Sequence, residues 1–284
     1  MGALRTTFPL IARLAFALPF PLPIFQRAIN ATLNMRNYAT KSLLRYRSLI
    51  DACSPQANQT LFTKIFQANN EGKLPFNEIR DEAQSYIIAG SDTTANTLTF
   101  LTWAVCRRPR LRDTLVRELQ TLPMGYTDDD LCHLTYLNHV IAETLRLYAA
   151  IPSSLPRVVP QGGAQLAGYW FDEHTVVSTQ AYSMHRNADV FPNPEKFDPS
   201  RWSSPNKAVK DHFMPFGRGS RACIGQHLAM IEIRLAVAQF FLAFPTASCS
   251  ARGGMIDSDM EQKSHFLLAS KGGRCIIELE HTAS

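Results

Sequence analysis

The sequence predicts a mainly α-helical α+β fold with a small β-sheet. Three observations support this prediction. Several segments have helical periodicity, short β-prone runs are confined to the middle and the end of the chain, and 45% of the 284 residues are apolar. A chain of this length and composition can bury one large core or two ordinary domains.

Helical periodicity recurs along most of the chain. The predicted helices cover residues 28–52, 76–108, 110–122, 134–148 and 224–244. The second of these ends because Pro109 cannot continue it and disfavours helical geometry at the residue before it. Its second half, residues 97–106, is apolar almost all round, so we expect it to be buried.

The β-prone runs are short. Residues 157–159, 166–171 and 175–179 favour strands and are separated by Gly and Asp. A stretch with little regular pattern follows over residues 185–215, which are rich in Pro and Asn. Residues 266–280 indicate a hairpin with Gly272 and Gly273 at the turn.

Charge and cysteine usage exclude some classes of protein. The net charge of +5, from 29 Lys and Arg against 24 Asp and Glu, is mild, and no basic run interleaves with aromatics, so no nucleic-acid partner is expected. No two cysteines form a C-x-x-C pair, which excludes a disulfide framework and a structural zinc pattern. The six cysteines are Cys53, Cys106, Cys132, Cys223, Cys249 and Cys275. We interpret all but one of them as reduced thiols in a cytosol-facing protein.

The N-terminal segment is strongly apolar over residues 8–25, but it is a poor membrane span. Arg13 interrupts it, and three prolines would break a helix. In a signal peptide, Arg13 would fall in the apolar centre. We expect residues 1–27 to be a surface-seeking segment that contacts a membrane face or covers a binding pocket.

A glycine-rich loop carries the sixth cysteine. Residues 216–225 read F-G-R-G-S-R-A-C-I-G, and the glycines allow a backbone to fold tightly around Cys223 so that its thiolate can reach a metal. A lone Cys is otherwise a small buried hydrophobe. Gly217, Gly219 and Ala222 also form a dinucleotide-like G-x-G-x-x-A string, but residues 211–215 are not the hydrophobic strand that such a site needs.

Two further motifs contain polar residues at informative spacings. Residues 89–94, A-G-S-D-T-T, lie in the long predicted helix, where Thr93 can bond a backbone carbonyl and open a local kink. The alternative is a satisfied Thr beside a surface Asp. Glu143 and Arg146 share a helix face at i, i+3 spacing, although an E-x-x-R spacing is common by itself.

Taken together, these motifs resemble the cytochrome P450 family of haem-thiolate monooxygenases. The loop matches the family's haem-binding pattern in register at five positions: Phe216, Gly219, Arg221, Cys223 and Gly225. Residues 89–94 match its oxygen-activation motif, and the E-x-x-R pair lies between the two, as in the family. The resemblance implies a P450 fold over a single partial domain, residues 1–284.

The resemblance also implies roles for residues around a haem b (iron protoporphyrin IX). Cys223 is the axial ligand of the iron, within a loop that includes Phe216 and Gly217. Arg221 and Arg157 meet the two propionates. His185 lies where the family often has a residue near the haem edge.

Other residues are implied to activate oxygen or to hold the scaffold. Asp92 and Thr93 take part in oxygen activation on the helix of residues 76–108, with Asp92 in the proton relay. Glu143, Arg146 and Arg201 form a buried structural triad. Ser200 stands where the family usually has Glu, which leaves the bonding residue Arg201 unchanged.

The implied activity inserts one oxygen atom from O₂ into an apolar small molecule, as in fungal secondary metabolism. Residues 149–155 are small and apolar and should line the substrate pocket. Electrons come from NADPH through a reductase that docks near Arg218 and Lys210. The implied location is the cytosolic face of the endoplasmic reticulum membrane, with the anchor segment outside this chain.

Two alternatives remain open. The family's catalytic domain is longer than this chain, which resembles its second half. The main alternative is therefore a truncated, non-catalytic or haem-deficient remnant that acts at most as a binding protein. A haem protein that carries out a peroxide rearrangement or a dehydration is the other, and the intact Asp92–Thr93 pair argues against it, because such enzymes need no oxygen activation.

Overall fold

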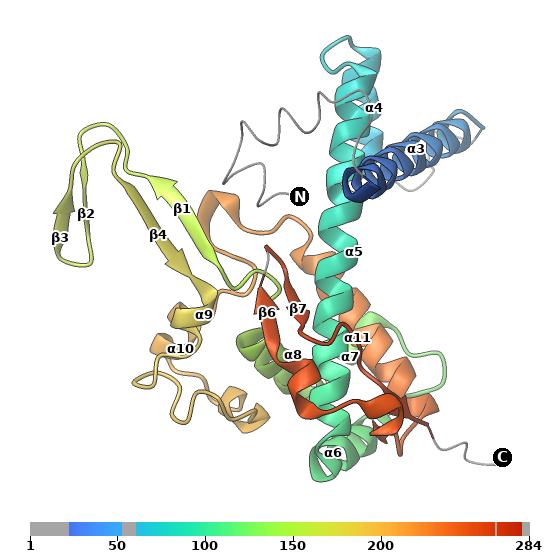
Figure 1. Ribbon diagram of the computed structural model, residues 1–284, viewed down its shortest axis with the longest axis vertical. Helices are drawn as coiled ribbons and strands as arrows, with labels where there is room; N and C mark the ends of the chain where they lie inside the picture. Colours follow the sequence, from blue (N-terminus) through green and yellow to red (C-terminus); the bar gives the residue numbers. More distant parts are fainter. Residues whose placement is uncertain (1–22, 53–60, 265, 280–284) are drawn as a thin grey trace. The chain divides into compact units, whose positions relative to one another are not determined.

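The computed structural model describes residues 23–52, 61–264 and 266–279 (Figure 1). The chain divides into two compact units, Met1–Ala89 and Gly90–Ser284, and the boundary falls within the long helix α5 (Phe76–Cys106). The N-terminal segment predicted over residues 1–27 lies outside the described residues except for the start of α3. In the described part of the chain, no helix is both long and apolar enough to cross a membrane.

The first unit contains α3 (Pro23–Ala52), α4 (Leu61–Asn70) and the start of α5. Its small core is formed by side chains from all three helices: Ala39, Leu43, Phe66, Ile79 and Ala83. The Tyr46 ring stacks on Phe66 at 6.1 Å between centroids, and its hydroxyl shares a 2.8 Å hydrogen bond with Thr63 Oγ1. The helix predicted over residues 28–52 is confirmed, whereas α4 was not predicted.

The second unit is built around a group of packed helices. They are the second half of α5, α6 (Pro109–Leu119), α7 (Asp128–Cys132), α8 (Thr135–Leu147) and α11 (Gln226–Ala243). Helix α11 packs against α6, α7 and α8 (Figure 1). The second half of α5 contributes Phe100 and Leu101 to the same core. The four longer helices were predicted within a few residues of these bounds. The prediction that residues 97–106 are buried is confirmed for most of them.

Local sequence accounts for where these helices begin. Pro109 is the first residue of α6, a position that needs no N–H donor. Thr127 and Asp130 form a capping box at α7, where Asp130 Oδ2 accepts the Thr127 N–H over 2.7 Å. The first turn of α8 is capped from outside, because the Glu118 carboxylate of α6 accepts the N–H groups of Tyr136 and Leu137, both over 2.8 Å.

The middle of the chain forms two nested antiparallel pairs. β1 (Ser154–Val158) pairs with β4 (Val176–Gln180), and the chain between them forms the hairpin β2 (Ala164–Leu166) and β3 (Tyr169–Phe171) (Figure 1). The run predicted over residues 166–171 is therefore split by a turn. Gly168 has a φ of +83°, which makes that turn possible.

The hairpin predicted at the C-terminal end is wrong. β7 (Leu268–Ser270) pairs with β6 (Gln262–Ser264), and β8 (Ile277–Glu278) pairs with β5 (Ser248–Cys249). Gly272 is not at a turn between paired strands. Its N–H donates to the Asp259 carbonyl over 2.8 Å, and a Cβ at this position would clash with the Asp259 side chain. Close approach to another segment, rather than a hairpin turn, therefore accounts for this glycine.

The stretch predicted to be irregular, residues 185–215, contains the 3₁₀ turn η1 (Pro199–Trp202) and the short helix α10 (Lys207–His212). Another short helix, α9 (Ala181–Met184), lies directly before it. The Asn206 side chain caps α10 by accepting the Val209 N–H over 2.9 Å. Further 3₁₀ turns are η2 (Gly219–Arg221), η3 (Arg252–Gly254) and η4 (Asp257–Met260).

Candidate functional site

The cysteine loop of residues 216–225 is closed by one backbone hydrogen bond. The Cys223 N–H donates to the Phe216 carbonyl over 2.8 Å, and η2 forms the turn between them. Gly217 and Gly219 have φ angles of +69° and +73°, in the left-handed region that favours glycine. The loop therefore presents Cys223 at its end, and the residue is exposed.

Backbone conformation, not lack of space, explains the glycine at position 217. A Cβ there would lie 3.7 Å from Leu155 Cδ1 and 3.8 Å from the Arg221 carbonyl oxygen, which are ordinary contact distances. A side chain would fit, but the positive φ would be strained. The same measurement places Leu155 of β1 beside the cysteine loop.

The surroundings of Cys223 suit a flat apolar group with acidic edges. Ile224 and Leu228 are 73% and 60% exposed, so apolar surface lies next to the thiol in the sequence and on the first turn of α11. Arg221 is exposed and forms no ion pair with the described residues. A thiol, apolar side chains and a free cation are the donor set that a haem with its propionates needs, so the residues present fit that group.

Arg157 lies on the strand that contacts the loop. Side chains two residues apart point to the same face of a strand, so Arg157 shares the face of Leu155. Its guanidinium is exposed and donates to the Pro156 carbonyl over 2.8 Å, with no carboxylate partner among the described residues. The structure thus brings β1 and the cysteine loop together, and the paired roles of Arg157 and Arg221 stay a prediction.

The polar residues of α5 lie on an unbroken helix. Asp92 is exposed and Thr93 is half-buried, and α5 remains α-helical through both. The opening expected at Thr93 therefore does not interrupt the helix. Instead, the Thr93 carbonyl accepts a 2.9 Å hydrogen bond from the hydroxyl of Thr97, one turn later. Thr97 is buried.

The predicted triad is formed, with Glu143 and Arg146 buried and Arg201 partly buried. Nε and Nη2 of Arg146 donate to the two carboxylate oxygens of Glu143, both over 2.9 Å, and both side chains have no exposed surface. Arg201 Nε approaches Glu143 Oε1 at 3.3 Å. Arg146 also donates to the carbonyls of three residues in the segment before η1: His185, Pro194 and Lys196. The network therefore fastens that segment to α8.

Two further donors to Glu143 were missed by sequence reasoning. The indole N–H of Trp202 donates to Glu143 Oε2 over 3.1 Å, and the Asp198 backbone N–H donates to Oε1 over 2.8 Å. The carboxylate thus accepts from four residues, which offsets the cost of burying its charge. Trp202 directly follows Arg201, but an indole next to an arginine gives no recognisable signal by itself.

His185 is buried and hydrogen-bonded through both ring nitrogens. Nδ1 lies 2.8 Å from the Arg146 carbonyl oxygen, and Nε2 lies 2.8 Å from the Met214 nitrogen. Burial lowers the pKa of His185 to about 4, and the positive charges of Arg146, Arg186 and His212 oppose protonation further. The residue expected near the haem edge therefore sits inside the scaffold, between α8 and the start of the cysteine loop.

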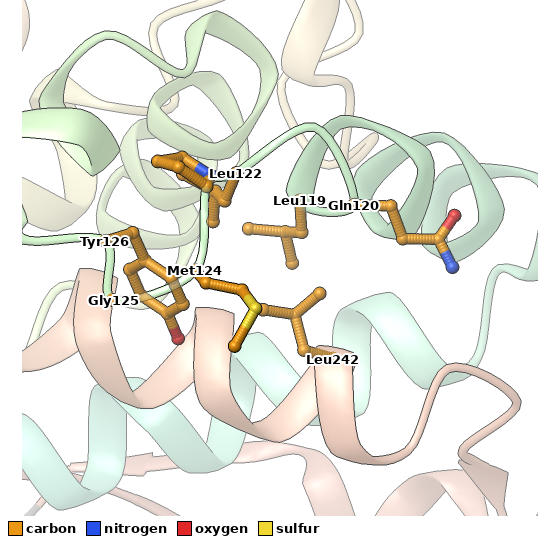
Figure 2. A pocket seen from close by; sticks show the side chains of 8 residues that line it. Leu119, Gln120, Leu122, Met124, Gly125, Tyr126 and Leu242 are labelled. Atoms are coloured by element: carbon orange, nitrogen blue, oxygen red, sulfur yellow. The ribbon is translucent and has the colours of Figure 1, made fainter.

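An apolar hollow lies elsewhere, between the end of α6 and α11 (Figure 2). It is lined by residues from both helices and the connection after α6: Leu119, Gln120, Leu122, Pro123, Met124, Gly125, Tyr126 and Leu242. None of the predicted site residues lines it. Of the predicted pocket segment, residues 149–155, Ala149 is buried against Ala181 and Met214, and Leu155 packs onto that cluster beside the cysteine loop.

The fold and these sites define a class: a mainly helical α+β protein with a glycine-rich thiol loop and a buried Glu–Arg–Arg network. A family profile described as cytochrome P450 matches residues 3–276. The chain therefore belongs to the cytochrome P450 family.

Individual proteins show the same likeness. Cytochrome P450 monooxygenase orf2 of Aspergillus niger is 47% identical over 280 residues, 98% of this chain and 56% of the relative. Cytochrome P450 monooxygenase tazI of Aspergillus terreus is 46% identical over 278 residues, 97% of this chain and 56% of the relative. The crystal structure of a cytochrome P450, CYP102L1, matches with a TM-score of 0.70 at 22% identity, over 87% of this chain and 56% of that chain. The chain thus spans little more than half the length of these proteins.

Proposed function

We propose that this chain provides the haem-thiolate site of a monooxygenase that inserts one oxygen atom from O₂ into an apolar small molecule. The observation that carries the proposal is the geometry of the cysteine loop, which presents an exposed thiol on a hydrogen-bonded turn with two left-handed glycines. Relatives that are named monooxygenases, with 46–47% identity, support it. When bound, a thiolate-ligated haem supplies the activation of dioxygen, a general property of this family.

The chain's own residues would hold the haem b in place. Cys223 Sγ would be the axial ligand of the iron, and Ile224 and Leu228 would cover apolar ring surface. The guanidinium groups of Arg221 and Arg157 would each pair with a propionate, a charge-assisted interaction for which both are exposed and lack carboxylate partners among the described residues.

Proton supply would come from α5. Asp92 is exposed, so its carboxylate can exchange protons with solvent, and the Thr93 hydroxyl is its neighbour along the chain. We assign Asp92 the uptake of protons and Thr93 Oγ1 their delivery toward the site. The alternative reactions, a peroxide rearrangement or a dehydration, would not use this pair.

The substrate would be an apolar small molecule, with a fungal secondary metabolite as the proposed class. Residues 149–155 are the proposed lining, because Leu155 lies beside the cysteine loop and the rest of the segment is small and, apart from Ser153 and Ser154, apolar. The relatives come from Aspergillus species, which is compatible with that class.

Electrons would come from NADPH through a reductase. Arg218 donates to the carbonyls of Lys210 and Phe213, which holds two exposed cations on one surface that leads into the cysteine loop. An acidic patch on a reductase would complement this surface. The proposed location is the cytosolic face of the endoplasmic reticulum membrane, with residues 1–27 as the segment that contacts it.

The experiment is the absorption spectrum of the purified, haem-supplemented and reduced chain under carbon monoxide. We expect the red-shifted Soret band of a thiolate-ligated haem. Cys223→Ala should abolish it, and Cys132→Ala, which removes another exposed cysteine, should leave it unchanged. Absence of the band in the unaltered chain would favour the alternative of a haem-deficient binding protein. Product formation that requires neither NADPH nor O₂ would favour a rearrangement.

A further inference from the structure

His185 links two segments that the proposed site depends on. Its ring has no exposed surface, and its nitrogens face two main-chain groups, the Arg146 carbonyl and the Met214 N–H, each at 2.8 Å. Arg146 lies in the last turn of α8, where carbonyls have no partner within the helix. The imidazole supplies that partner.

The partners fix which ring nitrogen carries the proton. A backbone N–H can only donate, so Nε2 must accept from Met214, and the proton must lie on Nδ1, which donates to the Arg146 carbonyl. A doubly protonated ring would place two N–H groups against each other at Met214. The arrangement therefore needs the neutral ring in the Nδ1–H form.

Met214 connects this ring to the cysteine loop. Its carbonyl accepts the Gly217 N–H over 3.0 Å, so both of its backbone polar groups are used, one toward His185 and one toward the loop. Its side chain is buried against Ala149 and Ala181. The next backbone bond, from Cys223 N–H to the Phe216 carbonyl, closes the loop itself. A short series of hydrogen bonds thus leads from α8 to the stem of the loop that carries Cys223.

The charged groups around the ring favour its neutral form. Arg146 of α8, Arg186 after α9 and His212 of α10 are the cations that face it. The Phe213 ring lies against the imidazole, with centroids 5.5 Å apart. Desolvation is the largest cause of the lowered pKa; the hydrogen bond to the Arg146 carbonyl acts against it and raises the pKa, and the neighbouring positive charges lower it further.

We propose that His185 is a positioning residue that holds the cysteine loop to α8 as a neutral Nδ1–H imidazole. This inference rests on the proposed function only in what the loop is for, since the hydrogen bonds themselves are present without a haem. A second consequence follows from linkage. The pKa of His185 in the folded chain lies below its ordinary value of about 6.5. The stability that this residue contributes is therefore fully present above pH 6.5 and is lost as the pH falls toward 4.

The first test uses the full chain without haem. Nitrogen NMR of the labelled ring should show Nδ1–H at pH 7, and the Nε2–H form or a charged ring would overturn the proposal. His185→Phe keeps a ring and removes both hydrogen bonds, so exchange of the Met214 amide should become about ten-fold faster or more. His185→Gln keeps one donor and one acceptor and should restore much of that protection.

The pH dependence separates positioning from mere packing. Between pH 6.5 and 4, the free energy of unfolding of the unaltered chain should fall with a slope that includes about one proton from His185. In His185→Gln this part of the slope should be absent, because glutamine does not titrate. His133→Gln, at an exposed position after α7, should keep the slope. An unchanged slope in His185→Gln, or an unchanged Met214 amide in His185→Phe, would overturn the proposal.

The hydrogen bonds by which His185 holds the cysteine loop to α8 are called the tether here. A final readout connects the tether to the haem site. In the haem-loaded chain, His185→Phe should bind haem but convert from the thiolate to the non-thiolate Soret band at a pH at least one unit higher than the unaltered chain does. His185→Gln should shift less. If the unaltered chain shows no thiolate band, the proposed function fails and the haem-free tests still decide the tether. If the band and its acid stability are the same in all three proteins, the tether fails and the proposed function stands.

Discussion

Arg146 and Glu143 form a fully buried, two-pronged ion pair, with Nε and Nη2 each 2.9 Å from a different carboxylate oxygen. The pair is not isolated. Glu143 also receives donors from η1 and from the residue before it, and Arg146 reaches carbonyls along residues 185–196. Removing one charge would therefore leave the other buried and poorly paired, which costs more than the pair contributes to stability.

The first prediction follows for Glu143→Gln. The substitution leaves the Arg146 charge without a counter-ion and places an amide N–H₂ where a carboxylate oxygen accepted hydrogen bonds. The free energy of unfolding in urea should fall by about 3–5 kcal/mol. Glu232→Gln, at an exposed position of α11, is the matched control and should change it by less than about 0.5 kcal/mol. A loss of under about 1 kcal/mol for Glu143→Gln would contradict the assignment.

The two arginines should respond unequally to lysine. Arg146 has no exposed surface and uses all three guanidinium nitrogens, which an ammonium group cannot replace, so Arg146→Lys should cost about 3 kcal/mol or more. Arg201 is 13% exposed and lies 3.3 Å from Glu143, so Arg201→Lys should cost about 1 kcal/mol. Urea unfolding of both variants gives the order, and equal losses would mean that the network is not centred on Arg146.

Much of the fold could be predicted because its signals are local. The helix α5 ends shortly before Pro109, α8 follows from apolar periodicity, and α11 follows from a long apolar run. The triad was found because the family resemblance gave Glu143, Arg146 and Arg201 before any distance was known. Residues 216–225 were found in the same way, with a recognisable order of glycines and cysteine.

Some of the misses have a physical cause in common, which is that the partners lie far apart in the sequence. Gly272 and Gly273 indicated a hairpin, but β7 pairs with β6 directly before it, and β8 pairs with the distant strand β5. Pairing of β5 with β8 depends on the packing of intervening residues and has no local signal. His185 bonds two main-chain groups, and main-chain groups are present at every position, so no pattern of side chains could predict its role.

A third prediction concerns proton supply and rests on the proposed function. Asp92→Asn keeps the shape of an exposed side chain on α5 but cannot carry a proton between solvent and the site. In the haem-loaded enzyme with its reductase, product formed per NADPH consumed should fall by about ten- to a hundred-fold, with unchanged haem content. Asp189→Asn, also exposed, serves as the control. Equal product yields from both variants would remove Asp92 from the proton path.

The ion pair between Asp128 of α7 and Arg234 of α11 predicts a dependence on low pH. Arg234 donates to both carboxylate oxygens over 2.7 Å, and this hydrogen bonding holds the pKa of Asp128 below its ordinary value. A carboxyl with a lowered folded pKa stabilises the protein above about pH 4 and ceases to do so as the pH falls through the folded pKa.

Asp128→Asn should therefore lower the free energy of unfolding by about 1 kcal/mol at pH 7, and the difference from the unaltered chain should shrink below pH 4. Unfolding curves across this pH range measure it. The neighbour Asp129 is exposed and pairs with no arginine among the described residues, so Asp129→Asn should show no such convergence. A constant difference at all pH values would mean that shape, not charge, holds α7 to α11.

The last prediction separates backbone strain from the function of the cysteine loop. Gly217 and Gly125 both have left-handed φ angles, +69° and +77°, and neither lacks room for a methyl group among the described residues. Alanine at either position should therefore cost a similar amount of stability, about 1–2 kcal/mol, through backbone strain alone. Only Gly217→Ala changes the cysteine loop, which presents Cys223. Titration with haem should show an affinity loss of about ten-fold or more for Gly217→Ala and little change for Gly125→Ala. Equal affinities at equal stability would mean that the left-handed turn at Gly217 is not what presents the thiol.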